Sequence, residues 1–337
     1  MSKKAYAAAG VDVDLGNTVK RGIQKLVRET HGPEVLGKIG GFGGLFRADF
    51  KGMKDPVLVS SVDGVGTKLK IAFATDKHDT IGQDLVNHCI DDIAVVGARP
   101  LFFLDYLASA TLEPKVFTQI LKGFAKACKA GGCALIGGET AQMPGMYQAG
   151  EYDVAGTIVG VVDRAKILDG SAVRKGDVLI GLASNGLHTN GYSLARKVLF
   201  DKMGLTTDSK LEGVKGTLGD ELLKVHKNYQ PLMASLPPKV LKAAAHITGG
   251  GLIDNLPRVL PADCDAEIDL ASWKVPTIFE IIGREGKVAR DEMYQVFNMG
   301  IGMVLIVAEK HAADTLKQTK GRVIGRIVPG KGVVQLR

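Results

Sequence analysis

The stretch VLVSSVDGVGTK, residues 57–68, joins a strand pattern to a glycine loop. Residues 57–62 follow Pro56 and are rich in valine, which predicts a strand. Directly after it, glycines let backbone N–H groups face an anion, Lys68 adds a cation, and Asp63 can hold Mg²⁺. The G-x-x-x-x-G-K-[ST] spacing of a Walker A loop is missing. We interpret the stretch as a strand that ends in a phosphate loop; a tight turn with surface charges is the alternative.

Strand and helix patterns alternate along the rest of the chain. Further strands are predicted at residues 101–107, 134–136, 157–162, 178–183, 303–307 and 323–328, and helices at 80–96, 114–130, 192–200 and 220–229. This alternation predicts an α/β (α+β) fold. A chain of 337 residues usually forms about two domains. Turn residues near Gly170 and Gly176 place the boundary there, so we expect domains over 1–170 and 171–337.

Composition excludes several classes of protein. Hydrophobic residues make up 45% and charged residues 23%, as in ordinary globular proteins, which argues against disorder. No apolar run reaches the roughly 18 residues of a membrane helix, and residues 1–17 lack the apolar core of a secretory signal. The net charge of +7 is spread along the chain and aromatics are only 6%, so we expect no nucleic-acid partner. Four cysteines without C-x-x-C spacing suggest reduced thiols, and we expect a cytoplasmic protein with no membrane partner.

Asp92 stands out in the predicted helix 80–96. At about 100° per residue it projects towards the apolar side of the helix. A carboxylate there is costly unless it is paired or bound to a metal, so we expect a functional role. Asp105, inside the apolar run 101–107, invites the same argument.

The other polar residues of this helix receive a different interpretation. Asp84 and Asp91 project to the face opposite the apolar sector, and His88 lies just outside its edge. For Asp84 and His88 we expect ordinary surface side chains.

Glycine supplies 43 of the 337 residues, about twice the usual share, and its clusters mark candidate binding loops. GGFGG at residues 40–44 is weak evidence, because flexible turns have the same composition. GGET at residues 137–140 follows a predicted strand and sets Glu139 beside glycines. A plain turn is the alternative for this second cluster.

Two further clusters lie in the second half of the chain. SNGLHTNGYS at residues 184–193 links a strand to a helix start, where a phosphate would be favoured. Thr189 or Asn190 could instead cap the helix. HITGGG at residues 246–251 sets His246 before three glycines, and both a functional histidine and an ordinary lone histidine are open interpretations. With no good covalent nucleophile in sight, the clusters together indicate a site that holds phosphates and orients reactants.

The order of these motifs resembles one enzyme family. AGVDVDLGN, GGFGG, SVDGVGTKLK, GGETAQMPGMY, SNGLHTNGYSLARK, HITGGG and FNMGIGM, spread over about residues 11–303, are similar to the phosphoribosylformylglycinamidine cyclo-ligases, also called aminoimidazole ribonucleotide synthetases. The DGVGTK loop alone would indicate only the wider superfamily, which includes formylglycinamidine synthetase, thiamine-monophosphate kinase and selenophosphate synthetase. A kinase-like enzyme of that superfamily is therefore the alternative.

The resemblance implies a ligase of purine biosynthesis with two α/β domains per chain. It implies a homodimer whose N-terminal domains build a shared β-barrel, with ATP in a cleft near the interface. The implied reaction uses ATP and Mg²⁺ to close formylglycinamidine ribonucleotide to 5-aminoimidazole ribonucleotide, releasing ADP and phosphate.

The resemblance also implies roles for individual residues. ATP and its metal would be bound by Asp63, Gly64, Gly66, Thr67, Lys68, Asp105, Gly138 and Thr140. Asp63 and Asp92 would hold Mg²⁺, and Lys68, Asp92 and Glu139 would be the catalytic residues. The substrate would be bound by Gly43, His188, Thr189, Asn190, Gly191 and His246. Gln24 departs from the family pattern, where many members have lysine.

Overall fold

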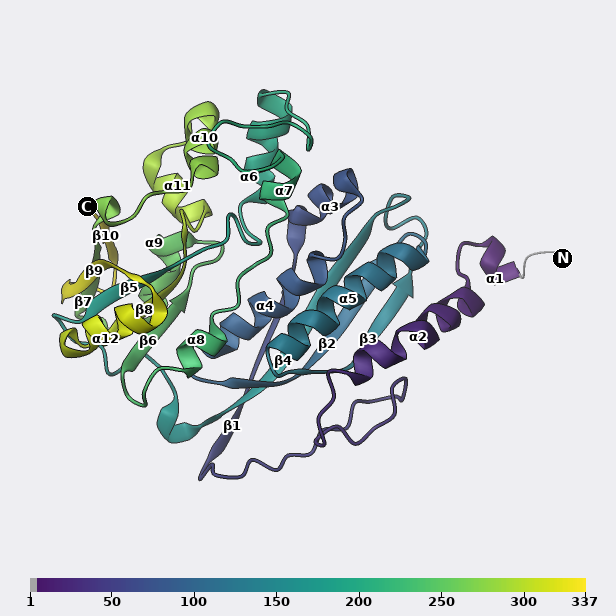
Figure 1. The fold of residues 1–337 in the computed structure, drawn as a ribbon, viewed down its shortest axis with the longest axis horizontal. Helices are drawn as coiled ribbons and strands as arrows, with labels where there is room; N and C mark the ends of the chain where they lie inside the picture. The colour runs from purple at the N-terminus through teal and green to yellow at the C-terminus, as the bar shows by residue number, and fades with distance from the viewer. Residues whose placement is uncertain (1–4) are drawn as a thin grey trace. The chain divides into compact units, whose positions relative to one another are not determined.

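Two sheets organise the chain in the computed structural model, which describes residues 5–337 (Figure 1). Each sheet belongs to its own compact unit. The first unit comprises the chain up to Ile93 together with Ala98–Ala165, and the second comprises Ala94–Gly97 with Lys166–Arg337.

The first unit is built on a four-stranded sheet of order β1-β4-β2-β3. Its strands are β1 (Pro56–Gly64), β2 (Arg99–Ser109), β3 (Ala134–Gln142) and β4 (Tyr152–Asp163). Strand β4 pairs antiparallel with β1 and β2, whereas β2 and β3 are parallel. Its helices are α1 (Ala5–Ala8), α2 (Val13–Arg28), α3 (Leu69–Thr75), α4 (Ile81–Ala94) and α5 (Pro114–Ala130), with a 3₁₀ turn at Gly66–Lys68.

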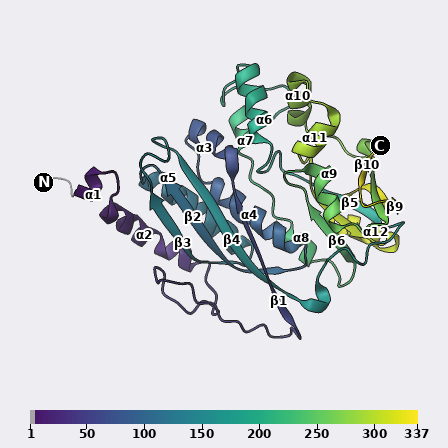
Figure 2. The same ribbon diagram turned by 180° about the vertical axis from the view of Figure 1, so that it is seen from behind.

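Helices α4 and α5 cover one face of this sheet (Figures 1 and 2). The Phe103 ring of β2 packs against Phe124 of α5, with ring centroids 5.9 Å apart. The two helices cross closely at Gly82 and Gly123. A Cβ atom on Gly82 would lie 2.3 Å from the carbonyl oxygen of Ile120, so only glycine fits this crossing.

The second unit is built on a six-stranded sheet of order β10-β7-β9-β5-β8-β6. Its strands are β5 (Val178–Ala183), β6 (Leu241–His246), β7 (Cys264–Ile268), β8 (Ile301–Val307), β9 (Arg322–Pro329) and β10 (Val334–Leu336). All pairs are antiparallel except β10 with β7. All residues of β8 are buried, which makes this strand the centre of the core.

Seven helices belong to the second unit: α6 (Tyr192–Arg196), α7 (Leu218–Leu222), α8 (Gln230–Ala234), α9 (Gly251–Asn255), α10 (Thr277–Gly286), α11 (Arg290–Val296) and α12 (Glu309–Thr319). Short 3₁₀ turns add to them at Leu256–Val259 and Leu270–Ser272, and a π turn follows α6 at Lys197–Lys202. Among residues 5–337, no helix is long and apolar enough to cross a membrane.

Several predicted elements are confirmed, and others differ in extent. Helix 114–130 and strand 178–183 have the predicted bounds. Strand 134–136 continues to Gln142, because its glycines pair with β2 as a parallel ladder; the GGET cluster therefore lies within a strand and the plain-turn interpretation is wrong. The predicted helix 192–200 divides into α6 and the π turn.

The helix predicted over residues 220–229 is wrong beyond its first turns. Helix α7 ends at Leu222, and the chain is irregular up to α8. Two contacts with the end of β5 hold this segment away from a helix. The Asn185 amide donates to the carbonyl oxygen of Val225 at 2.9 Å, and the Tyr229 hydroxyl donates to that of Ala183 at 2.9 Å.

The four cysteines Cys89, Cys128, Cys133 and Cys264 are free and buried, which confirms the expectation of reduced thiols. Burial raises the pKa of the Cys89 and Cys128 thiols well above the ordinary value. These thiols therefore act as core side chains rather than nucleophiles.

Candidate functional site

A cavity of about 440 Å³ lies in the first unit, against the outer strand β3. Its walls come from α2, α5, the middle of β2 and β3, and residues 38–44. It brings together five of the predicted site residues: Gly43, Asp105, Gly138, Glu139 and Thr140. Gln24, the residue that departs from the family pattern, lines the same cavity.

The cavity combines apolar walls with acidic groups and bare backbone. Val27, Phe117 and Leu121 supply apolar side chains, and the glycines of residues 40–44 present backbone without side chains. Asp105 and Glu139 add carboxylates. Such a lining suits a partly apolar small molecule that also carries polar groups.

Gly138 owes its identity to Asp105, its neighbour on the parallel strand β2. A Cβ atom on Gly138 would lie 2.3 Å from Asp105 Oδ1 and 2.6 Å from the carbonyl oxygen of Asp105. The strand pairing fixes the carbonyl oxygen, so only glycine fits opposite Asp105, and the Asp105 carboxylate lies in the space that a side chain at residue 138 would take. The sequence placed Asp105 in the predicted strand 101–107 and Gly138 in the glycine cluster after another strand, and the parallel register brings them side by side.

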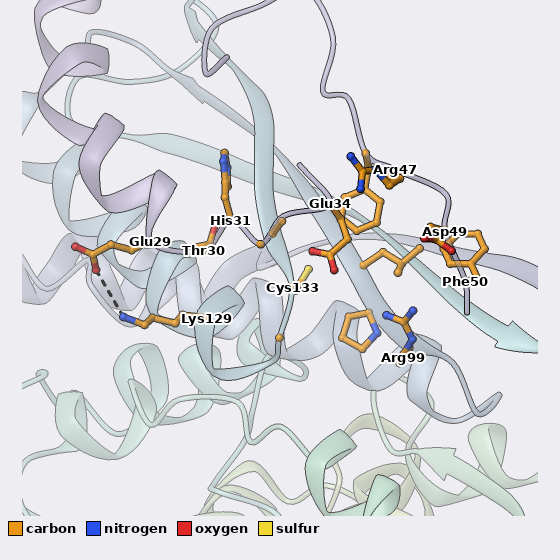
Figure 3. Close-up of a pocket in the computed structure, with 16 residues that line it drawn as sticks. Glu29, Thr30, His31, Glu34, Arg47, Asp49, Phe50, Arg99, Lys129 and Cys133 are labelled. Atoms are coloured by element: carbon orange, nitrogen blue, oxygen red, sulfur yellow. Dashed lines mark ion pairs between the residues drawn. The ribbon is translucent and has the colours of Figure 1, made fainter. Parts of the chain in front are cut away.

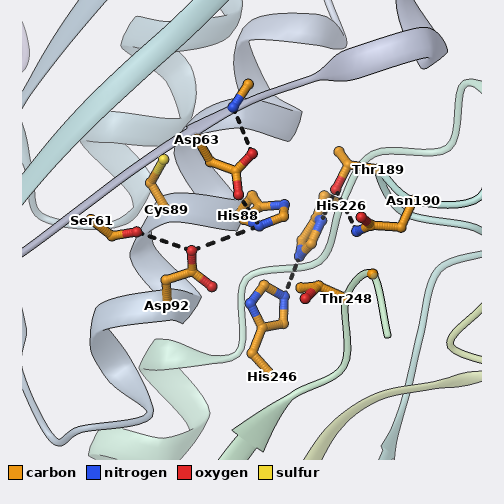
Figure 4. Close-up of polar contacts among 12 residues, drawn as sticks. Ser61, Asp63, His88, Cys89, Asp92, Thr189, Asn190, His226, His246 and Thr248 are labelled. Carbon is orange, nitrogen blue, oxygen red and sulfur yellow. Dashed lines mark hydrogen bonds and ion pairs between the residues drawn. The ribbon is translucent and has the colours of Figure 1, made fainter. Parts of the chain in front are cut away.

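A second polar group lies where β1 faces α4 (Figure 4). His88 Nε2 is 2.9 Å from Asp63 Oδ2 and 3.7 Å from Asp92 Oδ2. The Ser61 hydroxyl donates to Asp92 Oδ2 at 3.1 Å, and the backbone N–H of Gly64 donates to Asp63 Oδ1. The structure thus brings the two predicted metal ligands around one imidazole.

The charges in this group support one another. Burial lowers the pKa of His88, but the hydrogen bond with Asp63 and the charges of Asp92 and Asp63 outweigh it, so that the net pKa is raised. Burial raises the pKa of Asp63, yet the hydrogen bond and charge of His88 lower it below the ordinary value overall. The two carboxylates therefore favour the protonated form of this imidazole more than water would.

The surface interpretation of Asp84 and His88 is wrong. Asp84 is fully buried, and His88 is 4% exposed. Asp84 is buried because the turn that carries Lys68 covers this face of α4, and the Lys68 ammonium lies 2.9 Å from both Asp84 carboxylate oxygens. Asp91, on the same predicted face, is also fully buried.

Lys68 therefore points into the first unit. Its side chain has no exposed surface, and burial lowers the pKa of its ammonium although Asp84 opposes this shift. Gly66, at φ +67°, allows the backbone turn that precedes Lys68. Its neighbours Asp63 and Gly64 end β1, and Thr67 lies with Gly66 in the 3₁₀ turn.

The second unit gathers most of the predicted substrate residues. His188, Thr189, Asn190 and Gly191 form the loop between β5 and α6, and His246 ends β6. Gly191, at φ +77°, packs so closely on Phe297 that a Cβ atom would lie 2.2 Å from that ring. The backbone N–H of Asn185 donates to His188 Nε2 at 2.9 Å, so this ring also shapes its own loop.

His226 also belongs to this group, and sequence reasoning missed it. It is fully buried and contacts both Thr189 and His246. No glycine cluster or motif surrounds it, and the pattern placed it within a helix. A single histidine within a predicted helix does not by itself indicate a functional site.

A further pocket of about 360 Å³ in the first unit has a charged rim (Figure 3). Arg47, Arg99 and Glu34 line it, and Lys129 pairs with Glu29 at 3.7 Å. None of the predicted site residues lines this pocket.

Comparison with known proteins identifies the chain. The model "AIR synthase related protein, N-terminal domain" matches residues 49–162, and the model of the C-terminal domain of the same proteins matches 174–337. The class is thus that of AIR synthase related proteins. A phosphoribosylformylglycinamidine cyclo-ligase of Geotalea uraniireducens is 53% identical over 321 residues, 95% of this chain and 92% of the relative. The chain belongs to the phosphoribosylformylglycinamidine cyclo-ligase family, which confirms the resemblance in its motifs.

Two solved structures share the fold. A thiamine-monophosphate kinase from Stenotrophomonas maltophilia aligns with TM-score 0.70 at 19% identity, covering 93% of this chain and 95% of the kinase. The hydrogenase maturation protein HypE in complex with ATP aligns with TM-score 0.65 at 17% identity, covering 94% and 90%. The expected two-domain α/β fold is confirmed.

Proposed function

We propose that the protein catalyses the ATP-dependent closure of formylglycinamidine ribonucleotide to 5-aminoimidazole ribonucleotide, a step of purine biosynthesis. The observation that carries this proposal is the 53% identity to a cyclo-ligase over 95% of the chain. We place the enzyme in the cytoplasm, without a nucleic-acid or membrane partner, where its buried free thiols would stay reduced.

The reaction needs a leaving group that an amide oxygen lacks. ATP transfers its terminal phosphoryl group to the formyl amide oxygen, forming ADP. The amidine nitrogen then attacks the activated carbon, the carbon–oxygen bond breaks, and phosphate and one proton leave. Alignment and charge neutralisation supply most of the catalysis in such a phosphoryl transfer, so no covalent nucleophile is required.

We place ATP in the 440 Å³ cavity beside β3. Apolar walls and the bare glycine backbone suit an aromatic base, and Gly138 and Thr140 contact the nucleotide. Asp105 and Glu139 would orient its polar groups, with Glu139 next to the reacting centre. HypE, which shares the fold, has been solved in complex with ATP, and this supports ATP as the nucleotide.

Mg²⁺ fits the carboxylate pair of Asp63 and Asp92. Both residues lie around His88, and hard carboxylate oxygens are the ligands that Mg²⁺ prefers. When bound, the ion would neutralise phosphate charge. The group continues along the loop through Gly64, Gly66 and Thr67. Lys68 would hold the loop in place through its buried ion pair with Asp84.

For the substrate we propose contacts with Gly43, His188, Thr189, Asn190, Gly191 and His246.

Purified protein given ATP, Mg²⁺ and formylglycinamidine ribonucleotide is expected to form 5-aminoimidazole ribonucleotide with one ADP per ring closed. Coupled ADP detection and product chromatography measure the ratio. Equal ADP release without the substrate would contradict the proposal. Thiamine monophosphate, offered as the phosphoryl acceptor of the kinase alternative, should give no product.

We also propose a homodimer, formed through the face of the first sheet opposite α4 and α5. On β1, Leu58 and Val62 are 62% and 68% exposed, and Tyr106 on β2 is 39% exposed. Strand register puts all three on this one face. Exposed apolar side chains gathered on one face of a sheet favour an interface there.

The mass in solution, measured by light scattering after gel filtration, should therefore be near twice 35.7 kDa. Val62→Glu is expected to shift this mass towards one chain, because it would bury a charge at the interface. Val323→Glu, at an exposed strand position of the second unit, is the matched control and should leave the mass unchanged. A wild-type monomer with full activity would refute the dimer.

A further inference from the structure

His226 connects two residues of the second unit that sequence reasoning assigned to the substrate. Its Nδ1 lies 3.2 Å from Thr189 Oγ1, and its Nε2 lies 2.9 Å from His246 Nε2 (Figure 4). Both ring nitrogens are thus engaged by protein groups. His226 is fully buried, and His246 and Thr189 are 6% and 9% exposed.

The ring of His226 is held from its face as well as from its edges. The His188 ring stacks on it, with centroids 4.1 Å apart and planes 30° apart. His188 Nε2 accepts the Asn185 backbone N–H, so that His188 is neutral and carries its proton on Nδ1. Space for this stack depends on Gly302, where a Cβ atom would lie 2.6 Å from His188 Cε1.

Proton counting limits the chain Thr189–His226–His246 to two arrangements when both rings are neutral. Only one proton fits between two Nε2 atoms at 2.9 Å. If His226 donates it, His226 Nδ1 accepts the Thr189 hydroxyl proton, and His246 carries its proton on Nδ1. If His246 donates it, His226 Nδ1–H donates to Thr189 Oγ1, and His246 Nδ1 carries a lone pair.

We infer that His226 is a positioning residue that couples the orientation of the Thr189 hydroxyl to the tautomer of His246. The inference rests on the proposed function for the role of Thr189 and His246 in substrate binding. When a ligand oxygen accepts the Thr189 hydroxyl proton, Thr189 Oγ1 can in turn accept a hydrogen bond from His226 Nδ1–H. His246 then keeps its proton on Nε2 and presents a lone pair at Nδ1. Ligand contact at Thr189 thereby determines whether His246 Nδ1 carries a proton or a lone pair.

The first test needs no substrate. Histidine ring ¹⁵N shifts are measured on the full-length protein, with assignment by single substitution. Thr189→Val keeps the shape of the side chain and removes the hydroxyl, and His226→Phe keeps a ring and removes both nitrogens. Both are expected to shift the His246 ring nitrogens, whereas His311→Gln on α12 should leave them unchanged. Unchanged His246 signals in both variants would overturn the coupling.

The second test uses turnover. His226→Phe is expected to lower kcat for ring closure by roughly ten- to a hundredfold while KM for the nucleotide substrate changes much less. His226→Gln, which can still bond His246 Nε2, should recover part of the loss. Thermal melting of each variant is compared with that of His311→Gln. Full kcat in His226→Phe would overturn the inference.

The two tests separate this inference from the proposed function. A wild-type protein that closes no ring refutes the proposed function, and the ring ¹⁵N shifts still decide whether His226 couples Thr189 to His246. If His226→Phe does not fold, His226→Gln and Thr189→Val carry the same two measurements.

Discussion

Asp92→Asn is expected to lower the rate of ring closure by roughly 10²-fold or more, the scale of removing one electrostatic stabiliser. Asparagine keeps the size of the side chain and can still accept from the Ser61 hydroxyl, which lies 3.1 Å from Asp92 Oδ2. It removes the charge that, with Asp63, would hold the metal. Steady-state kinetics at varied Mg²⁺ concentration measure the effect, and the variant should need more Mg²⁺ than the wild type.

Stability separates a ligand role from a structural one. The Asp92 side chain is 26% exposed, so the neutral variant should melt at nearly the wild-type temperature. Asp79→Asn, an exposed acid just before α4, is the matched control and should keep full activity. Asp84→Asn, which helical periodicity would suggest as control, is unsuitable because Asp84 is buried. A large loss of stability with turnover intact would refute the metal-ligand role of Asp92.

Asp84→Asn is expected to destabilise the protein by about 3–5 kcal/mol, the cost of breaking a buried ion pair from one side. The substitution replaces the charged partner of the buried Lys68 ammonium by a neutral amide. Because neither side chain is exposed, water cannot replace the lost charge. Urea unfolding followed by circular dichroism measures the difference in the free energy of unfolding.

A double variant tests the physical reason. Lys68→Met with Asp84→Leu replaces both charges by apolar groups of similar volume and should recover most of the stability lost in Asp84→Asn. Asp79→Asn should cost less than about 1 kcal/mol, as expected for an exposed acid near a helix start. If Asp84→Asn unfolds at the wild-type urea concentration, the pair is not a determinant of stability.

Local patterns predicted what depends on local sequence. Helix 114–130 begins at Pro114 and repeats apolar residues at helical spacing, so its bounds followed directly. Strand 178–183 is a short apolar run between turns. The family could be predicted from the order of the motifs, because this order can be read without knowing which residues are in contact.

Partners distant in sequence explain what the patterns could not predict. A helical wheel places Asp84 on a polar face, but it cannot reveal that Lys68, from the turn before α3, covers that face. Glycine clusters after a strand suggest loops, and only the parallel register with β2 shows that Gly138 is part of β3. His226 became visible as a candidate only when the fold brought it to Thr189 and His246.

The close crossing of α4 and α5 at Gly82 and Gly123 limits how far the polar side chains on α4 can be displaced. Asp92 and His88 are carried by α4, whose distance from α5 is fixed where Gly82 approaches the Ile120 carbonyl. A methyl group at Gly82 would displace α4 from α5. The Asp92 carboxylate and the His88 imidazole would then move relative to Ser61 and Asp63 on β1. Gly82 and Gly123 therefore help to fix the positions of the Asp92 carboxylate and the His88 imidazole, neither of which lies at the crossing.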